Sequence, residues 1–167
     1  MDVFNEELLA FWTILNKNQV RYITVGGVAA ILHGHDRLTG DMDIWIDDTI
    51  ENRRALRVAF KEAGMGDFFM MEQLQIVPGW TYFYLNNGLR LDLMINVKGL
   101  EEFGFDECLQ QASVAEIHGI QVPVLNLNHL LLAKKAANRP KDQLDIDFIE
   151  RVQKLKGGAE NGSETQG

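Results

Sequence analysis

Hydrophobic and polar positions alternate along this chain with periods that predict both helices and strands. Apolar residues recur at helical spacing over Glu6–Asn16, and Asn5 precedes them in the position of an N-cap. The β-branched and aromatic run Tyr22–Val25 predicts a strand, which ends at a glycine pair. Val28–Leu32 then predicts a short helix, and a polar loop follows it. We therefore expect a helix–strand–helix unit at the start of the chain.

A second strand is predicted by strict alternation over Met42–Asp47. Three apolar side chains should point one way and three others the opposite way, namely Met42, Ile44 and Ile46 against Asp41, Asp43 and Trp45. Asp48 or Thr49 then begins a helix that should end at Gly64, a typical residue after a helix C-terminus.

The rest of the chain continues to mix both types of element. The pattern predicts strands over 80–85 and 89–97 joined by an Asn-Asn-Gly turn, a helix over 100–111, a short strand pair over 114–117 and 121–125, and helices over 127–137 and 141–154. The hairpins favour an α+β fold with a mixed sheet flanked by helices. We expect one domain over residues 1–156 and a disordered, glycine-rich tail over 157–167.

Composition limits the classes of protein that need consideration. The chain has 167 residues, of which 16 are Lys or Arg and 24 are Asp or Glu, so its formal net charge is −8. This balance weighs against a duplex-DNA binder, which needs many cations. The single cysteine, Cys108, excludes an internal disulfide framework. Apolar runs are too short to span a bilayer, and the acidic N-terminus is unlike a signal peptide. We expect a cytoplasmic protein that uses neither membrane nor duplex DNA.

Two aspartates on the second strand are the first candidate for chemistry. Asp41 and Asp43 are two residues apart, so both carboxylates leave the same face of a strand. Carboxylates this close repel each other unless a cation lies beside them, and Mg²⁺ prefers such oxygen ligands. The alternative is a pair of solvated aspartates on an edge strand.

A third aspartate strengthens the metal interpretation. Asp92 lies in the apolar stretch Leu89–Ile95, where an acid is costly without a partner. If its strand lies beside Asp41 and Asp43, three carboxylates converge and could hold two Mg²⁺ ions roughly 4 Å apart. The alternative is an ion pair of Asp92 with Arg90 or Arg37.

A glycine pair lies where the first strand ends and a helix begins. Gly26 and Gly27 would let an anion approach the backbone N–H groups there. Alone this is weak evidence, because turns use glycine pairs constantly.

Together these residues resemble a known superfamily. Gly26-Gly27, then Arg37-x-Thr39-x-Asp41-x-Asp43, then Asp92 on a later strand is similar to the nucleotidyltransferase superfamily related to DNA polymerase β. The stretch 25–47 looks closest to small prokaryotic nucleotidyltransferase-like proteins, including the abortive-infection toxin group and lincosamide adenylyltransferases. The C-terminal pattern Leu131-x-x-Lys134, Arg139, Lys141-Asp142-x-x-Asp145 is similar to the ending of that group.

The resemblance implies a role for each matching residue. Gly26 and Gly27 would hold the β- and γ-phosphates of a nucleoside triphosphate. Asp41 and Asp43 would bind Mg²⁺, and Asp92 would bind a second ion and act as general base. Many relatives have serine where this chain has Gly27, so a contact must come from elsewhere. The remaining nucleotide-binding candidates are Arg37, Thr39 and Lys134, whereas Asp142 and Asp145 should brace the last helix.

The expected activity is Mg²⁺-dependent transfer of a nucleoside monophosphate to an acceptor hydroxyl, with release of pyrophosphate. The acceptor is open between a small molecule, a tRNA end and a protein, and the acidic charge favours a small cationic one. The resemblance to toxin–antitoxin proteins implies a possible protein partner. The alternative is a non-catalytic nucleotide-binding or partner-binding module on the same fold.

Two further groups of side chains have open interpretations. Trp80, Tyr82 and Tyr84 share one strand face, where they could stack a base or pack beneath a helix. Four cations on one predicted helix could meet RNA or form a solvated face: Arg53, Arg54, Arg57 and Lys61.

Overall fold

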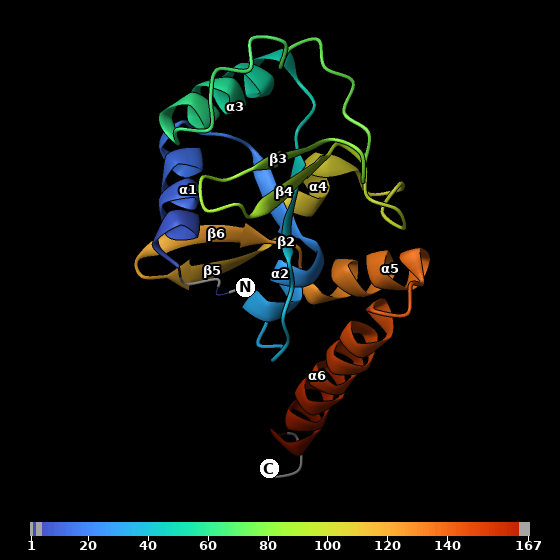
Figure 1. Cartoon of the computed structure of the whole chain (residues 1–167). Coiled ribbons are helices and arrows are strands. Elements are labelled where there is room, and N and C mark those ends of the chain that lie inside the picture. Colours follow the sequence, from blue (N-terminus) through green and yellow to red (C-terminus); the bar gives the residue numbers. More distant parts are fainter. Residues whose placement is uncertain (1, 3–4, 164–167) are drawn as a thin grey trace.

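The computed structural model describes residue 2 and residues 5–163, which form one mixed sheet with helices on both sides (Figure 1). The elements in chain order are α1 (Glu6–Lys17), β1 (Tyr22–Val25), α2 (Gly26–Leu32), β2 (Asp41–Ile46), α3 (Ile50–Glu62), β3 (Tyr82–Tyr84), β4 (Arg90–Met94), α4 (Gly104–Gln110), β5 (Ser113–Ile117), β6 (Ile120–Val124), α5 (Leu127–Ala137) and α6 (Asp142–Ser163). None of these helices is long and apolar enough to cross a membrane.

The sheet has the strand order β3-β4-β2-β1-β6-β5. β2 runs parallel to β4 and antiparallel to β1, while β3 and β5 are antiparallel edge strands paired with β4 and β6. β1 and β6 are parallel. The sheet therefore contains both kinds of pairing, which confirms the predicted α+β class with a mixed sheet.

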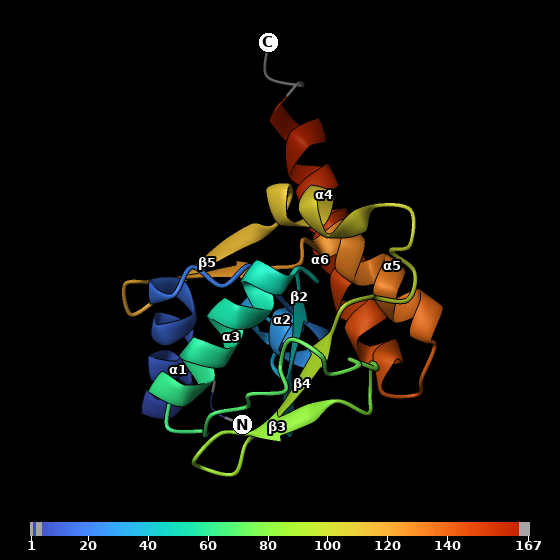
Figure 2. The same cartoon turned by 90° about the horizontal axis from the view of Figure 1, so that it is seen from above.

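The two faces of the sheet have different neighbours. α1 and α3 cover one face, whereas α4 and α5 lie on the other side of the sheet (Figure 2). On the first face Phe60 of α3 packs against Phe11 of α1 at 6.1 Å and Phe83 of β3 at 5.0 Å between ring centroids. On the second face Trp45 of β2 meets Phe105 of α4 edge to face, with ring centroids 5.4 Å apart. Burial of each such ring stabilises the fold by about 1.5–3 kcal/mol.

Local signals fix most element boundaries. The Asn5 side chain accepts a hydrogen bond from the N–H of Leu8 at 2.8 Å, so the predicted cap of α1 is confirmed. Thr49 caps α3, because its hydroxyl accepts from the N–H of Asn52 at 3.1 Å. Of the two residues that the sequence offered for this position, Thr49 is therefore the N-cap, and Asp48 forms an ion pair with Arg53 at 2.7 Å.

Some elements differ in length from the prediction. β3, β4 and α4 are shorter than expected, since the adjoining residues form turns such as the one in which Trp80 N donates to Val77 O. α6 extends past Lys156 to Ser163, so residues 157–163 are helical where the sequence predicted a disordered tail. Each residue added to an existing helix gains one hydrogen bond, which favours this extension. Residues 164–167 lie outside the described part of the chain.

Candidate functional site

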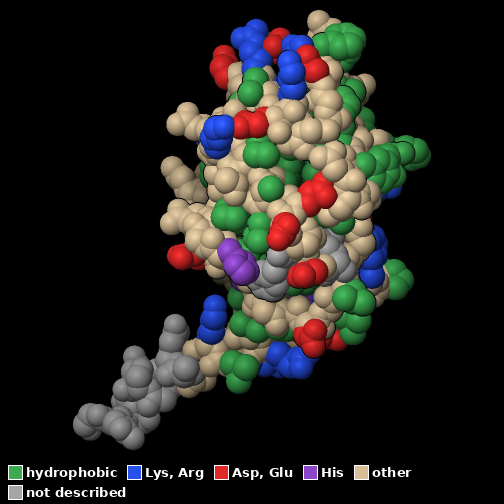
Figure 3. All heavy atoms as spheres, turned by 60° about the vertical axis from the view of Figure 1, so that its left-hand side comes forward, with side chains coloured by type: hydrophobic (Ala, Val, Ile, Leu, Met, Phe, Trp, Pro, Cys, Tyr) green, Lys and Arg blue, Asp and Glu red, His purple; other side chains and the backbone are tan. Residues whose placement is uncertain are grey.

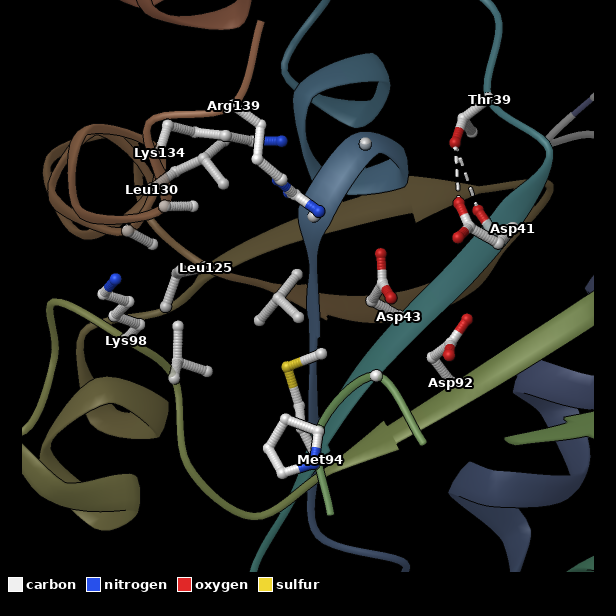
Figure 4. Close-up of a pocket in the computed structure, with 18 of the residues that line it drawn as sticks. Thr39, Asp41, Asp43, Asp92, Met94, Lys98, Leu125, Leu130, Lys134 and Arg139 are labelled. Carbon is white, nitrogen blue, oxygen red and sulfur yellow. Dashed lines mark hydrogen bonds between the residues drawn. The ribbon is translucent and has the colours of Figure 1, made fainter. Parts of the chain in front are cut away.

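Two neighbouring strands place three carboxylates on one face of the sheet. β2 and β4 are parallel, and their register sets Asp43 beside Asp92. Asp41 lies two residues before Asp43, so its side chain leaves the same face. One oxygen from each carboxylate lies within 4.8 Å of the others (Figure 4). The convergence expected from the sequence is therefore present in the structure.

The middle acid of this cluster has an unusual electrostatic environment. The pKa of Asp43 is raised to about 7, first by burial and then by the negative charges of Asp41 and Asp92, against opposing effects of Lys134 and Lys141. A carboxyl group that resists ionisation next to two other acids is a site where a cation would bind favourably. The donor set contains only carboxylate oxygens, which fits a hard ion such as Mg²⁺.

Asp92 already has a counter-ion within the protein. It is only 4% exposed, and Arg90 donates to its Oδ2 from Nε at 3.0 Å and to its Oδ1 from Nη2 at 2.8 Å. The Arg90 guanidinium also lies 4.0 Å from the centroid of the Tyr82 ring. Of the two ion pairs considered from the sequence, the one with Arg90 is therefore formed, and Arg37 lies with a different acid.

The glycine pair gives two polar side chains room to approach the backbone. Gly26 has a φ of +69°, and a Cβ there would overlap the Asp43 carboxylate, lying 3.0 Å from its Cγ. A Cβ at Gly27 would lie 2.9 Å from the hydroxyl oxygen of Thr39. The same hydroxyl is 3.2 Å from Oδ1 of Asp41, to which it donates. Glycine at both positions is therefore needed to pack the acid-bearing strand against the start of α2.

Two predicted phosphate ligands share one buried carboxylate. Asp145 of α6 is fully buried and pairs with Arg37 Nη1 at 2.6 Å and with Lys134 Nζ at 2.7 Å, while His35 Nδ1 lies 3.0 Å away. Burial alone would raise the pKa of Asp145, but hydrogen bonds from Lys134 and Arg37 outweigh it and hold the pKa below its ordinary value. These contacts tie the loop before β2 to α5 and α6.

A second buried acid fixes the turn between α5 and α6. Asp142 accepts from the backbone N–H of Arg139 at 3.0 Å and from its Nε at 2.8 Å, and Lys134 lies 3.5 Å away. Asp142 and Asp145 therefore brace the last helix, as the sequence suggested, and they hold Lys134 between them.

The eight catalytic and nucleotide-binding candidates predicted from the sequence line one cavity of about 470 Å³. Its polar end contains the predicted site residues Gly26, Gly27, Arg37, Thr39, Asp41, Asp43, Asp92 and Lys134. Its other end is largely apolar and lies between the end of β4 and α5 (Figure 4), with side chains that include Met94, Val97, Leu125, Leu130 and Ala133.

Sequence reasoning gave no role to several cations of this cavity. Lys98, Arg139 and Lys141 also line it. Arg139 and Lys141 belong to the C-terminal pattern, which was the signal available for them. Lys98 follows β4 in an irregular segment, so no periodicity indicated where its side chain would lie.

Comparisons with known proteins agree with this arrangement. The profile of a family described as "Nucleotidyl transferase of unknown function (DUF2204)" matches residues 5–160. The crystal structure of a candidate nucleotidyltransferase from Thermotoga maritima has a similar fold, with a TM-score of 0.52 and 19% sequence identity over 92% of this chain and 91% of that one. No curated protein matches the chain.

Proposed function

We propose that this chain, which belongs to the nucleotidyl transferase family matched above, moves a nucleoside monophosphate group from a triphosphate to an acceptor hydroxyl. The observation that carries the proposal is the convergence of Asp41, Asp43 and Asp92 beside a glycine pair at one end of a cavity. In the reaction the acceptor oxygen bonds to the α-phosphorus, the bond from that phosphorus to the bridging oxygen breaks, and pyrophosphate leaves.

Asp41, Asp43 and Asp92 would hold Mg²⁺, and three carboxylates are enough for two ions. When bound, the metal would neutralise charge on the triphosphate and on the departing pyrophosphate. The raised pKa of Asp43 supports this assignment. Its ionised form is disfavoured by burial and by two neighbouring acids, and a bound cation would stabilise it.

Asp92 would accept the proton of the acceptor hydroxyl. Its two oxygens accept hydrogen bonds from Arg90, so Arg90 must release at least one oxygen when Asp92 takes this role. Arg90 has 37% of its side-chain surface exposed, which gives it room to move.

The residues around the glycine pair would bind the phosphates. The backbone N–H groups of Gly26 and Gly27 supply donors, and the Thr39 hydroxyl stands where a side chain at position 27 would otherwise lie. Thr39 is therefore a replacement for the hydroxyl that Gly27 lacks. Arg37 and Lys134 add positive charge, which Asp145 keeps in place.

The apolar end of the cavity would take the base of the nucleotide. Met94, Leu125 and Leu130 offer surfaces for a planar ring. Lys141, whose charge acts on Asp43, adds a cation that a triphosphate would meet, whereas Lys98 lies at the apolar end near Leu125 (Figure 4).

A thermal-shift experiment tests the nucleotide assignment. Mg²⁺ together with a nucleoside triphosphate should raise the melting temperature, since a ligand that binds only the folded state stabilises it. ATP, GTP, CTP and UTP are compared on the wild type, on Asp43→Asn and on Asp36→Asn, which changes an exposed acid of the preceding loop. The shift should persist in Asp36→Asn and disappear in Asp43→Asn. Absence of a shift with all four triphosphates would contradict the proposal.

A further inference from the structure

We propose that three exposed aromatic residues beside Asp92 form the acceptor site, and that the acceptor is a small, phosphate-free alcohol with a planar ring. We call Trp80, Tyr82 and Tyr84 the aromatic strip. The inference rests on the proposed function, because it names the substrate that would receive the nucleotide.

The sheet register places the strip next to the third acid. β3 pairs with β4 so that Tyr82 lies opposite Asp92 and Tyr84 lies opposite Arg90. Directly paired residues have side chains on the same face, and neighbouring strands are about 4.8 Å apart. The two tyrosines therefore continue the face that carries the acids, on the side away from the glycine pair.

The strip is uncovered on a firmly packed strand. Trp80 is 81% exposed, Tyr82 45% and Tyr84 56%, so among the described residues no helix covers them. The two tyrosine rings meet edge to face with centroids 5.7 Å apart. Phe83 between them points to the opposite face and packs on Phe60 at 5.0 Å and Phe68 at 4.7 Å. β3, with its two tyrosines, and the turn before it, with Trp80, thus present large aromatic surfaces to solvent, which is an unfavourable arrangement without a ligand.

Arg90 connects the acid cavity with the strip. It lines the wall of the cavity together with Pro78 and Gly79, and its guanidinium lies over the Tyr82 ring. Trp80 and Tyr82 also line a separate, mainly apolar hollow of about 510 Å³, whose other walls include Phe68 and Phe83. A ring resting on the strip would therefore lie one strand away from Asp92, close enough for an attached hydroxyl to reach it.

The charge beside the strip argues against a nucleic acid as occupant. Arg90, the cation that contacts Tyr82, is paired with Asp92. The arginines of α3 lie on the other face of the sheet, where Arg54 and Arg57 pair with Glu72 and Asp67 at 2.6 Å in each case. Figure 3 shows blue and red side chains interleaved at the top of the molecule, over α3. Because Arg90 already has a partner, a polyphosphate chain would gain little by binding at the strip.

The chemistry of the rings also indicates the type of acceptor. The faces of tyrosine and tryptophan rings stack on planar rings and attract cations. The Arg90 guanidinium lies over the face of Tyr82, so a planar group can be accommodated there. A compact alcohol with one ring can use these faces while leaving the phosphate-binding end of the cavity to the nucleotide.

Ligand-observed NMR tests the strip without metal or nucleotide. The probe is tyrosol, 4-(2-hydroxyethyl)phenol, titrated against the wild-type chain. We expect saturable binding that weakens about 5- to 150-fold in Tyr82→Ala, on the scale of losing one aromatic stacking partner. Tyr82→Phe keeps the ring and should keep the affinity, which separates loss of stacking from misfolding. Leu155→Ala, an exposed change on α6, should leave binding unaltered.

Three results would overturn the inference. One is no tyrosol binding to the wild type. Another is tyrosol binding that Tyr82→Ala and Trp80→Ala leave unchanged. The third is evidence for a different occupant of the strip, which would be either self-association of the chain that Trp80→Ala abolishes or binding of a six-nucleotide single-stranded RNA that Tyr82→Ala abolishes. None of these results affects the triphosphate-induced melting shift, so failure of this inference and failure of the proposed function are distinguishable.

Discussion

Arg90 donates hydrogen bonds to both carboxylate oxygens of Asp92, at 2.8 and 3.0 Å, while its guanidinium lies over the ring of Tyr82. Arg90 thus compensates the charge of one of the three clustered acids. It also connects the acid cavity with the aromatic strip. Arg90 and a bound cation would therefore compete for the carboxylate oxygens of Asp92.

Removing this arginine should make the protein more dependent on metal. Without Mg²⁺, Arg90→Gln should melt at a lower temperature than the wild type, because the buried Asp92 loses its counter-ion. Adding Mg²⁺ should raise the melting temperature of the variant by more than that of the wild type. Arg54→Gln removes an exposed, paired arginine of α3 and serves as control. An unchanged Mg²⁺ response in Arg90→Gln would show that the two cations do not compete.

The raised pKa of Asp43 predicts a pH dependence of stability in the absence of metal. The folded pKa is about 7 against an ordinary value of 3.8, so the folded state binds this proton more tightly than the unfolded state. The free energy of unfolding should therefore fall as the pH rises from about 4 to about 7. Asp43→Asn removes the penalty and should be the more stable protein at pH 8, by up to about 4 kcal/mol.

Urea unfolding at pH 5 and pH 8 with EDTA measures this effect. The stability difference between Asp43→Asn and the wild type should be larger at pH 8 than at pH 5. A difference that is the same at both pH values would mean that Asp43 does not titrate in this range.

Asp145 should contribute strongly to the stability of the polar end of the cavity. Asp145→Asn leaves Arg37 and Lys134 without their shared partner in a buried position, which should cost about 3–5 kcal/mol. Because its folded pKa is lowered, the contribution of Asp145 is present above the ordinary pKa of an aspartate and is lost as the pH falls below it. Urea unfolding of the wild type and both variants measures this loss. Asp147→Asn changes an exposed acid on the same helix and should have little effect. Equal stability of the two variants would contradict the importance of this network.

Gly26 should be needed both for the left-handed backbone conformation at its position and for the binding of Mg²⁺ and triphosphate at the acids. Gly26→Ala places a Cβ against the Asp43 carboxylate at a φ of +69°. Gly104→Ala is a matched control, since Gly104 has the same φ and no atom within 4 Å of a Cβ. Both variants should lose about 1–2 kcal/mol to the left-handed backbone. Only Gly26→Ala should also lose the melting shift with Mg²⁺ and triphosphate, and a retained shift would argue against crowding of Asp43.

The geometry of the acid cluster could be predicted from the sequence because it depends on period-two alternation. Asp41 and Asp43 share a face on any strand, and Asp92 needs only a neighbouring strand to join them. Asn5 and Gly64 likewise act through their immediate neighbours, as an N-cap and as a residue with a φ of +77°. The alternation and the caps are local signals, whereas the position of Asp92 also depended on the pairing of β2 with β4.

Contacts between distant segments could not be predicted in this way. Asp145 lies 108 residues from Arg37, and nothing in the spacing of either residue indicates their pairing. Arg53 belongs to a run of cations that suggested a solvated or RNA-binding face. It is instead only 8% exposed and donates to the carbonyl oxygens of Met71 and Leu74, because the loop after α3 folds back onto the helix. The exposure of Trp80 could not be predicted either, because whether a helix covers a given strand face depends on the arrangement of all the elements.

The central claim is nucleotide transfer at the three acids, and label transfer measures it most directly. The purified chain is incubated with Mg²⁺, each α-labelled nucleoside triphosphate and a cell extract, and labelled small molecules, RNA and protein are separated. The account predicts transfer by the wild type and by Asp36→Asn, with pyrophosphate released in equal amount, and loss of transfer by at least 100-fold in Asp43→Asn, on the scale of losing one essential electrostatic group. Transfer that continues in Asp43→Asn, or no labelled product with any of the four triphosphates, would contradict it.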